Sequence, residues 1–135
     1  MSDASDLSSL YFQWSKAVDD YRDNNLATLT SEQKFRLKDL SNHLDDLATH
    51  FTLADVATTL ASIQTEVDQI KVVTADAKNT LKQLETLDRV MKGVAAVISM
   101  GLSAQSGNAG GVVGAIGDLE KAVTGGKRNS RFLFQ

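Results

Sequence analysis

The chain has 135 residues, of which 42% are hydrophobic and 23% charged, and it contains no cysteine and no proline. This length and composition are typical of one soluble globular domain, and the lack of cysteine excludes disulfides, thiolate nucleophiles and cysteine-based zinc sites. The net charge is −3, with the acidic excess before residue 56 and three basic residues without an acid after residue 124. Because an acidic surface repels phosphate backbones, we expect no nucleic-acid binding.

The N-terminus begins with the polar, acidic stretch MSDASDLSS, which is unlike a cleaved secretory signal. The location is therefore open between the cytoplasm and export without a cleaved signal. A first helix is expected from Ser5 or Asp6 to about Leu26. Its apolar face repeats at the three- and four-residue steps of an amphipathic helix. The residues of this face are Leu7, Leu10, Tyr11, Trp14, Val18 and Tyr21.

A second helix is expected to run from Thr30 to about His50. Thr30 followed by Gln33 forms the pattern of a capping box, in which each residue's side chain bonds the other's backbone N–H. The apolar seam of this helix is Leu37, Leu40, Leu44, Leu47 and then Phe51. The short connections on either side favour antiparallel neighbours in a helical bundle.

The longest stretch without proline or an early glycine is residues 52–104, which we expect to be one long third helix. Thr52 and Asp55 match a second capping box at its start. Apolar or small residues follow at helical spacing at Val56, Leu60, Ile63, Val67, Ile70, Thr74, Ala77, Leu81 and Leu84. A break near Thr74, after two other β-branched residues, is the alternative, but the stripe keeps its register there and favours a continuous helix.

Residues 93–117 contain no charged side chain. Their centre, residues 103–111, has the composition of a Gly/Ser/Asn loop, and a last helix is expected over residues 112–124, ended by Gly125 and Gly126. The predicted fold is thus all-α: an antiparallel bundle of four to five helices with coiled-coil-like spacing, a long third helix and a glycine-rich helical hairpin. Residues 1–126 form the single domain, followed by a basic and aromatic tail, residues 127–135.

The uncharged hairpin is the candidate functional region, because the far half of a long third helix would outrun its neighbours and expose apolar surface. We expect a non-enzymatic interaction protein that self-associates as a homo-oligomer or binds a protein partner. Small residues four apart would let another helix approach closely. The candidate interaction residues are Ala95, Ser99, Met100, Leu102, Ser103, Val112 and Ile116.

The alternative function is a membrane-active protein that inserts residues 93–117 as a hairpin. Each apolar part of this run is well short of the ~20 residues that a spanning helix needs, so the membrane is the less favoured partner. The tail could act as an interfacial anchor through Phe132, Leu133 and Phe134, or as an intramolecular latch or a frayed end.

Other kinds of site find little support in the sequence. Asp39, His43, Asp46 and His50 follow one helical stripe and could hold a divalent metal, but one helix cannot supply all the ligands of a bundle site. We therefore expect an exposed stripe and no metal. The glycines lack the strand–turn–helix setting of a phosphate-binding loop. Neither histidine has an identifiable nucleophile partner, so we expect no catalysis and no cofactor.

Overall fold

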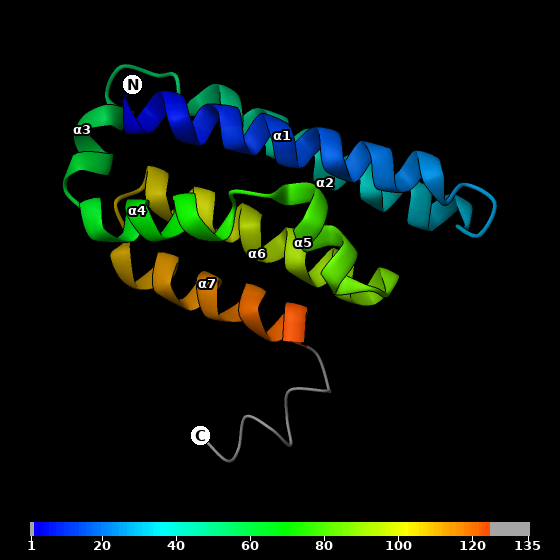
Figure 1. Ribbon diagram of the computed structural model, residues 1–135. Helices are drawn as coiled ribbons and strands as arrows, with labels where there is room; N and C mark the ends of the chain where they lie inside the picture. Colours follow the sequence, from blue (N-terminus) through cyan, green and yellow to red (C-terminus); the bar gives the residue numbers. More distant parts are fainter. Residues whose placement is uncertain (1, 125–135) are drawn as a thin grey trace, which may run out of the picture.

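The computed structural model describes residues 2–124, which form seven α-helices and no strand (Figure 1). The helices are α1 (Asp3–Asn24), α2 (Ser31–His50), α3 (Val56–Ala61), α4 (Gln64–Val73), α5 (Ala77–Leu84), α6 (Leu87–Gln105) and α7 (Ala109–Thr124). The predicted all-α class is confirmed, but these helices outnumber the four to five that we expected.

Two antiparallel hairpins organise the fold. Helices α1 and α2 form one hairpin and α6 and α7 form the other, and the three short helices α3 to α5 connect the two (Figure 1). Helix α4 contacts both α1 and α7, while α6 contacts α2. The apolar faces of both hairpins therefore meet the connecting segment in one continuous core.

The ends of the first two helices follow from local capping. Helix α1 begins earlier than predicted because the Ser2 hydroxyl accepts a hydrogen bond from the backbone N–H of Ser5, at 3.1 Å. The capping box of α2 is confirmed: the Gln33 N–H donates to the Thr30 hydroxyl, and the Gln33 side chain accepts from the Thr30 N–H. Helix α2 ends at His50, as expected.

The prediction of one long third helix is wrong. Residues 52–104 are divided among α3, α4, α5 and α6, so the coiled-coil seam expected along them is not formed. The second capping box is also wrong, because Thr52 lies in the turn after α2, where its hydroxyl donates to the carbonyl of Thr49. Asp55 precedes α3 but makes no capping bond with its side chain.

The break near Thr74 has a clear cause in the packing of α1. The indole N–H of the buried Trp14 donates to the carbonyl of Thr74 at 3.0 Å, so this carbonyl is satisfied from another helix. The Thr74 hydroxyl turns back to the carbonyl of Ile70, at 2.7 Å. Helix α5 then starts with its own cap, because the Asp76 carboxylate accepts from the N–H of Asn79 at 3.1 Å.

A second break separates α5 from α6. Glu85 has a φ of 65°, a left-handed conformation that a residue with a Cβ rarely adopts and that ends α5. Helix α6 restarts at once because the Thr86 hydroxyl accepts from the N–H of Arg89, at 3.3 Å. The reversal at this point brings α6 back alongside α2.

The apolar stripe survives all these breaks. Every residue predicted for the inner face of residues 56–84 is buried, including Thr74 at 1% exposure. In α2, Leu40 is only half-buried, whereas the other members of its seam are buried. The breaks therefore redirect the chain around the core without turning an inward residue outward.

The connection within the second hairpin is shorter than predicted. Helix α6 continues to Gln105 and α7 begins at Ala109, so the loop is residues 106–108 and not 103–111. Gly107 has a φ of 74° and the Asn108 side chain accepts from the N–H of Gly111, at 2.9 Å, which starts α7 before residue 112. The predicted glycine cap at residues 125–126 and the tail at 127–135 lie outside the described residues.

Candidate interaction surface

The outer face of α6 carries three of the candidate interaction residues. Ala95, Ser99 and Leu102 follow one another at helical spacing and are all exposed, with Leu102 57% exposed. None of the three carries a charge, since residues 93–117 contain no ionisable side chain. The structure thus places a smooth, uncharged stripe on the outside of the second hairpin.

The remaining candidates are not on this stripe. Met100 and Val112 are fully buried, so they contribute to the core of the folded chain and not to a free surface. Ser103 and Ile116 are half-buried, Ser103 at the contact between α6 and α7 and Ile116 toward α4. Position in the sequence did not distinguish the exposed candidates from the buried ones, because neighbouring residues of a helix point in different directions.

Close approach of the two helices occurs at one pair of small residues. A Cβ placed on Gly111 would lie 3.0 Å from the Cβ of Ser103 and nearer still to its Oγ, and the second contact is closer than real Cβ atoms come, so glycine at residue 111 lets α7 approach α6 there. Ser103 was one of the predicted contact residues, whereas Gly111 was not. Gly110 and Gly114, which lie near Gly111 in α7, are exposed.

The fold does not require glycine at two positions in the middle of α7. A Cβ on the exposed Gly114 or on the half-buried Gly117 would have no atom of the described residues within 4 Å. Glycine inside an exposed helix costs about 1 kcal/mol relative to alanine, because it loses more backbone freedom on folding. Gly114 therefore destabilises the hairpin and leaves part of its outer surface without a side chain, whereas Gly117 lines a groove toward α4.

The outer stripe of α6 and one flank of α7 form a shallow groove. Ala95 and Ser99 lie on its α6 side, and Asp118 and Lys121 on its α7 side. Gly114 is four residues before Asp118 and so lies on the same flank of α7, one turn toward the loop. We call the surface formed by the following exposed residues the hairpin face: Ala95, Ser99, Leu102, Gly110 and Gly114.

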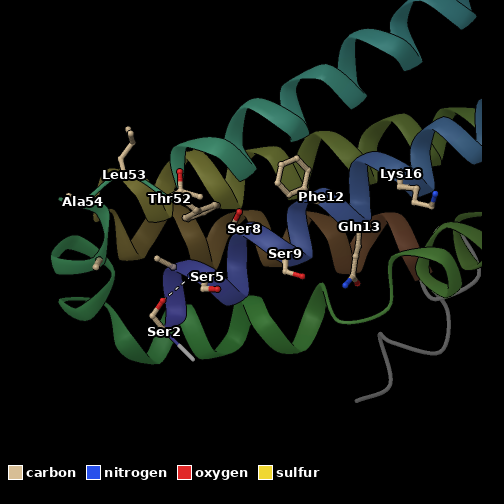
Figure 2. A pocket seen from close by; sticks show the side chains of 13 residues that line it. Ser2, Ser5, Ser8, Ser9, Phe12, Gln13, Lys16, Thr52, Leu53 and Ala54 are labelled. Carbon is tan, nitrogen blue, oxygen red and sulfur yellow. Dashed lines mark hydrogen bonds between the residues drawn. The ribbon is translucent and has the colours of Figure 1, made fainter.

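A second candidate groove lies between the first half of α1 and the turn after α2 (Figure 2). Its apolar members include Phe12, 49% exposed, and Leu53, 50% exposed. Serine and threonine hydroxyls and Lys16 make up most of its polar lining. Phe12 is not among the residues predicted for the apolar face of the first helix, and Leu53 was expected within the long third helix.

The Figure 2 groove offers apolar side chains, hydroxyls and the Lys16 ammonium to a ligand. Lys16 is the one ionisable residue among the described residues that line it, so none of these supplies a carboxylate or imidazole to activate a serine hydroxyl. The buried Ser8 is already engaged, because its hydroxyl donates to the carbonyl of Ala48 at 2.8 Å. An apolar side chain of a ligand would find contacts with Phe12 and Leu53.

Charged residues of α1 and α4 form ion pairs that hold the two helices together. The Lys71 ammonium on α4 donates to Asp3 and, at 3.2 Å, to Asp6, both near the start of α1. The hydrogen bond from Lys71 lowers the pKa of Asp3, and the same bond raises the pKa of Lys71. These opposed shifts show that the ion pair favours both charged forms and ties α4 to the N-terminus of the first hairpin.

The histidine stripe of α2 is exposed along its whole length, at Asp39, His43, Asp46 and His50. Within residues 2–124, no group of three histidine or carboxylate side chains is placed to hold a metal ion. Within the same range, no helix combines the length and apolarity needed to cross a bilayer. Comparisons with protein-family models, with curated proteins and with solved structures give no match to this chain.

Proposed function

We propose that this chain is a non-enzymatic helical interaction protein that binds another helix through the hairpin face. Its function would be assembly, either with a second copy of the chain or with a helix of a protein partner. The observation that carries the proposal is the exposed Gly114 in α7 beside the uncharged stripe of α6. Its cost to helix stability is offset if a second helix packs where the side chain is missing.

A second copy of the chain is the partner that this surface fits best. In a two-fold symmetric contact the same surface meets itself, so each residue must tolerate its own neighbours. The hairpin face has no charge to repel its copy, and its small residues allow two helices to approach closely. Leu102, 57% exposed, supplies apolar area that such a contact would remove from water.

The proposal is tested by light scattering after size exclusion over a range of protein concentrations. We expect a concentration-dependent dimer, and we expect Ser99→Leu to weaken it at least tenfold, or about 1.4 kcal/mol, because a bulky side chain separates the two backbones. The stability of the monomer should change little, because Ser99 is exposed on α6. Ser9→Leu, the same change at an exposed site in the groove of Figure 2, is the matched control.

The proposal that the partner is a second copy fails if the wild-type chain remains monomeric at ~1 mM, which corresponds to an association weaker than about −4 kcal/mol. It also fails if Ser9→Leu disrupts the dimer and Ser99→Leu does not, since the groove of Figure 2 would then be the interface. A parallel measurement with anionic liposomes separates the membrane alternative: binding that protects residues 93–117 from protease would favour insertion over assembly.

A further inference from the structure

The other flank of α7 forms an apolar groove with α4. Val72 is 75% exposed and Val113 is 53% exposed, which is unusual for two branched aliphatic residues in one groove. The lining comprises Thr65, Asp68, Gln69, Val72, Val73, Val113, Ile116, Gly117 and Glu120. This groove shares no lining residue with the groove beside the hairpin face.

The electrostatic character of this groove sets it apart. Among the described residues, its lining includes two acids, Asp68 and Glu120, both exposed, and no basic residue. The linings of four other grooves on the described surface are neutral or positive, including the one on the opposite flank of α7, which has Lys92 and Lys121 against Asp118. A ligand suited to the α4–α7 groove is therefore apolar in part and basic in part.

One segment of the chain itself has this composition. Residues 127–135, KRNSRFLFQ, contain three basic residues and no acidic one, and they end in the apolar run Phe132, Leu133 and Phe134. The basic residues come first along the chain and the aromatic residues follow. The α7 side of the groove has the same order when it is followed backwards along the helix, from Glu120 to Ile116 and Val113.

The segment is also long enough to reach the groove. Val113 lies eleven residues before Thr124, the end of α7, which is about 16 Å along the helix at ~1.5 Å per residue. Residues 125–132 can span at most ~26–29 Å when extended, so length remains for a reversal of direction. Gly125 and Gly126 come at the point where the chain must reverse, and glycine adopts the required backbone angles at little steric cost.

We propose that residues 127–135 bind back into the α4–α7 groove of the same chain. Phe132 and Phe134 cover Val72 and Val113, and the basic residues lie beside Asp68 and Glu120. The segment then shields one flank of α7 from other partners and leaves the hairpin face on the opposite flank free. This inference concerns a different surface from the proposed function, so either can fail without the other.

The absence of cysteine makes a direct distance measurement possible. Gln135→Cys gives the full chain one thiol for a nitroxide label, and the amide signals of the labelled protein report which residues lie near it. We expect a severalfold greater loss of signal intensity at Val72 and Val113 than at Ala95 and Ser99 on the opposite side of α7. The measurement is made on dilute protein, so that contacts between copies do not contribute.

Charge reversal then tests the cause of the contact. Asp68→Lys with Glu120→Lys should abolish the selective signal loss, and adding Arg128→Glu with Arg131→Glu should restore it. Asp118→Lys, a matched change on the opposite flank of α7, should leave the loss unchanged. All the acids involved are exposed, so these variants are expected to fold.

Several outcomes would overturn the proposal. Equal signal loss on both flanks of α7, or none, shows that the segment does not select this groove. A loss that survives Asp68→Lys with Glu120→Lys removes the electrostatic basis. A loss at Val72 in isotope-labelled chains mixed with spin-labelled, isotope-free chains assigns the groove to a second copy. Contact of the label only with vesicles of phosphatidylcholine and phosphatidylglycerol assigns the segment to a lipid surface.

Discussion

The glycines of the second hairpin allow a quantitative test of the structure. Gly114→Ala in α7 should stabilise the folded monomer by about 1 kcal/mol, the difference in helix propensity between the two residues. No steric cost reduces this gain, because a Cβ on Gly114 would have no atom of the described residues within 4 Å. The added methyl group should at the same time weaken self-association, since it lies on the hairpin face.

Gly101→Ala in α6 is the matched opposite. A Cβ there would lie 3.0 Å from Tyr11 Cε2 and 3.1 Å from Leu47 Cδ1. The Tyr11 ring has little freedom to move, because its hydroxyl donates to the carbonyl of Val97 at 2.7 Å and the residue is fully buried. Overpacking of this kind costs about 1–3 kcal/mol.

Both substitutions gain the same helix propensity, so the difference between their free energies of unfolding isolates the steric cost, about 1–3 kcal/mol in favour of Gly114→Ala. Urea denaturation followed by circular dichroism at low protein concentration measures both values. If Gly101→Ala is as stable as Gly114→Ala, the close contact of α6 with α1 is wrong. If Gly114→Ala is destabilising in the monomer, the outer flank of α7 is not free.

Three further changes test the packing of the other helices. Trp14→Phe removes the hydrogen bond to the carbonyl of Thr74 and should cost about 1–3 kcal/mol in urea denaturation, whereas a smaller loss means that this carbonyl finds another partner. Thr30→Ala should cost about 1 kcal/mol through the lost cap of α2, and a neutral result contradicts the capping box. Asp3→Asn removes one of the two carboxylate partners of Lys71 and leaves Asp6. The pKa of Asp3 in the folded protein lies below its ordinary value of 3.8, because the Lys71 ammonium favours the charged carboxylate. At neutral pH the wild type should therefore be more stable than the variant, by less than ~1 kcal/mol. This difference in the free energy of unfolding should vanish as the pH falls through the folded pKa.

The inward stripe could be predicted from the sequence, whereas the helix breaks could not be settled from it, because a break near Thr74 was only the alternative to a continuous helix. Periodicity identifies which residues are apolar on one side, and Leu60, Val67 and Leu81 are all buried as that pattern requires. The break at Thr74 depends on a hydrogen bond from Trp14, sixty residues away, which no local pattern contains. Asp76, the N-cap residue of α5, follows this break. Asparagine stands three residues after it, where a capping box has glutamate or glutamine, so the capping-box pattern is absent.

The candidate surface shows the same division. The uncharged run and its small residues are plain in the sequence, but their exposure depends on which side of each helix faces the core. Ser99 and Met100 are neighbours in the chain, yet Ser99 is exposed and Met100 is fully buried. Gly111 and Gly114 are equally small, and only Gly111 lies against α6. The apolar groove between α4 and α7 was invisible because α4 was expected to be part of a longer helix.

The central claim, that the hairpin face is the contact surface, is tested most directly by amide chemical shifts recorded at low and high protein concentration. The account predicts that the shifts that change with concentration cluster at Ala95, Ser99, Leu102, Gly110 and Gly114. Changes that cluster at Phe12 and Leu53, or a spectrum that does not depend on concentration, would contradict it.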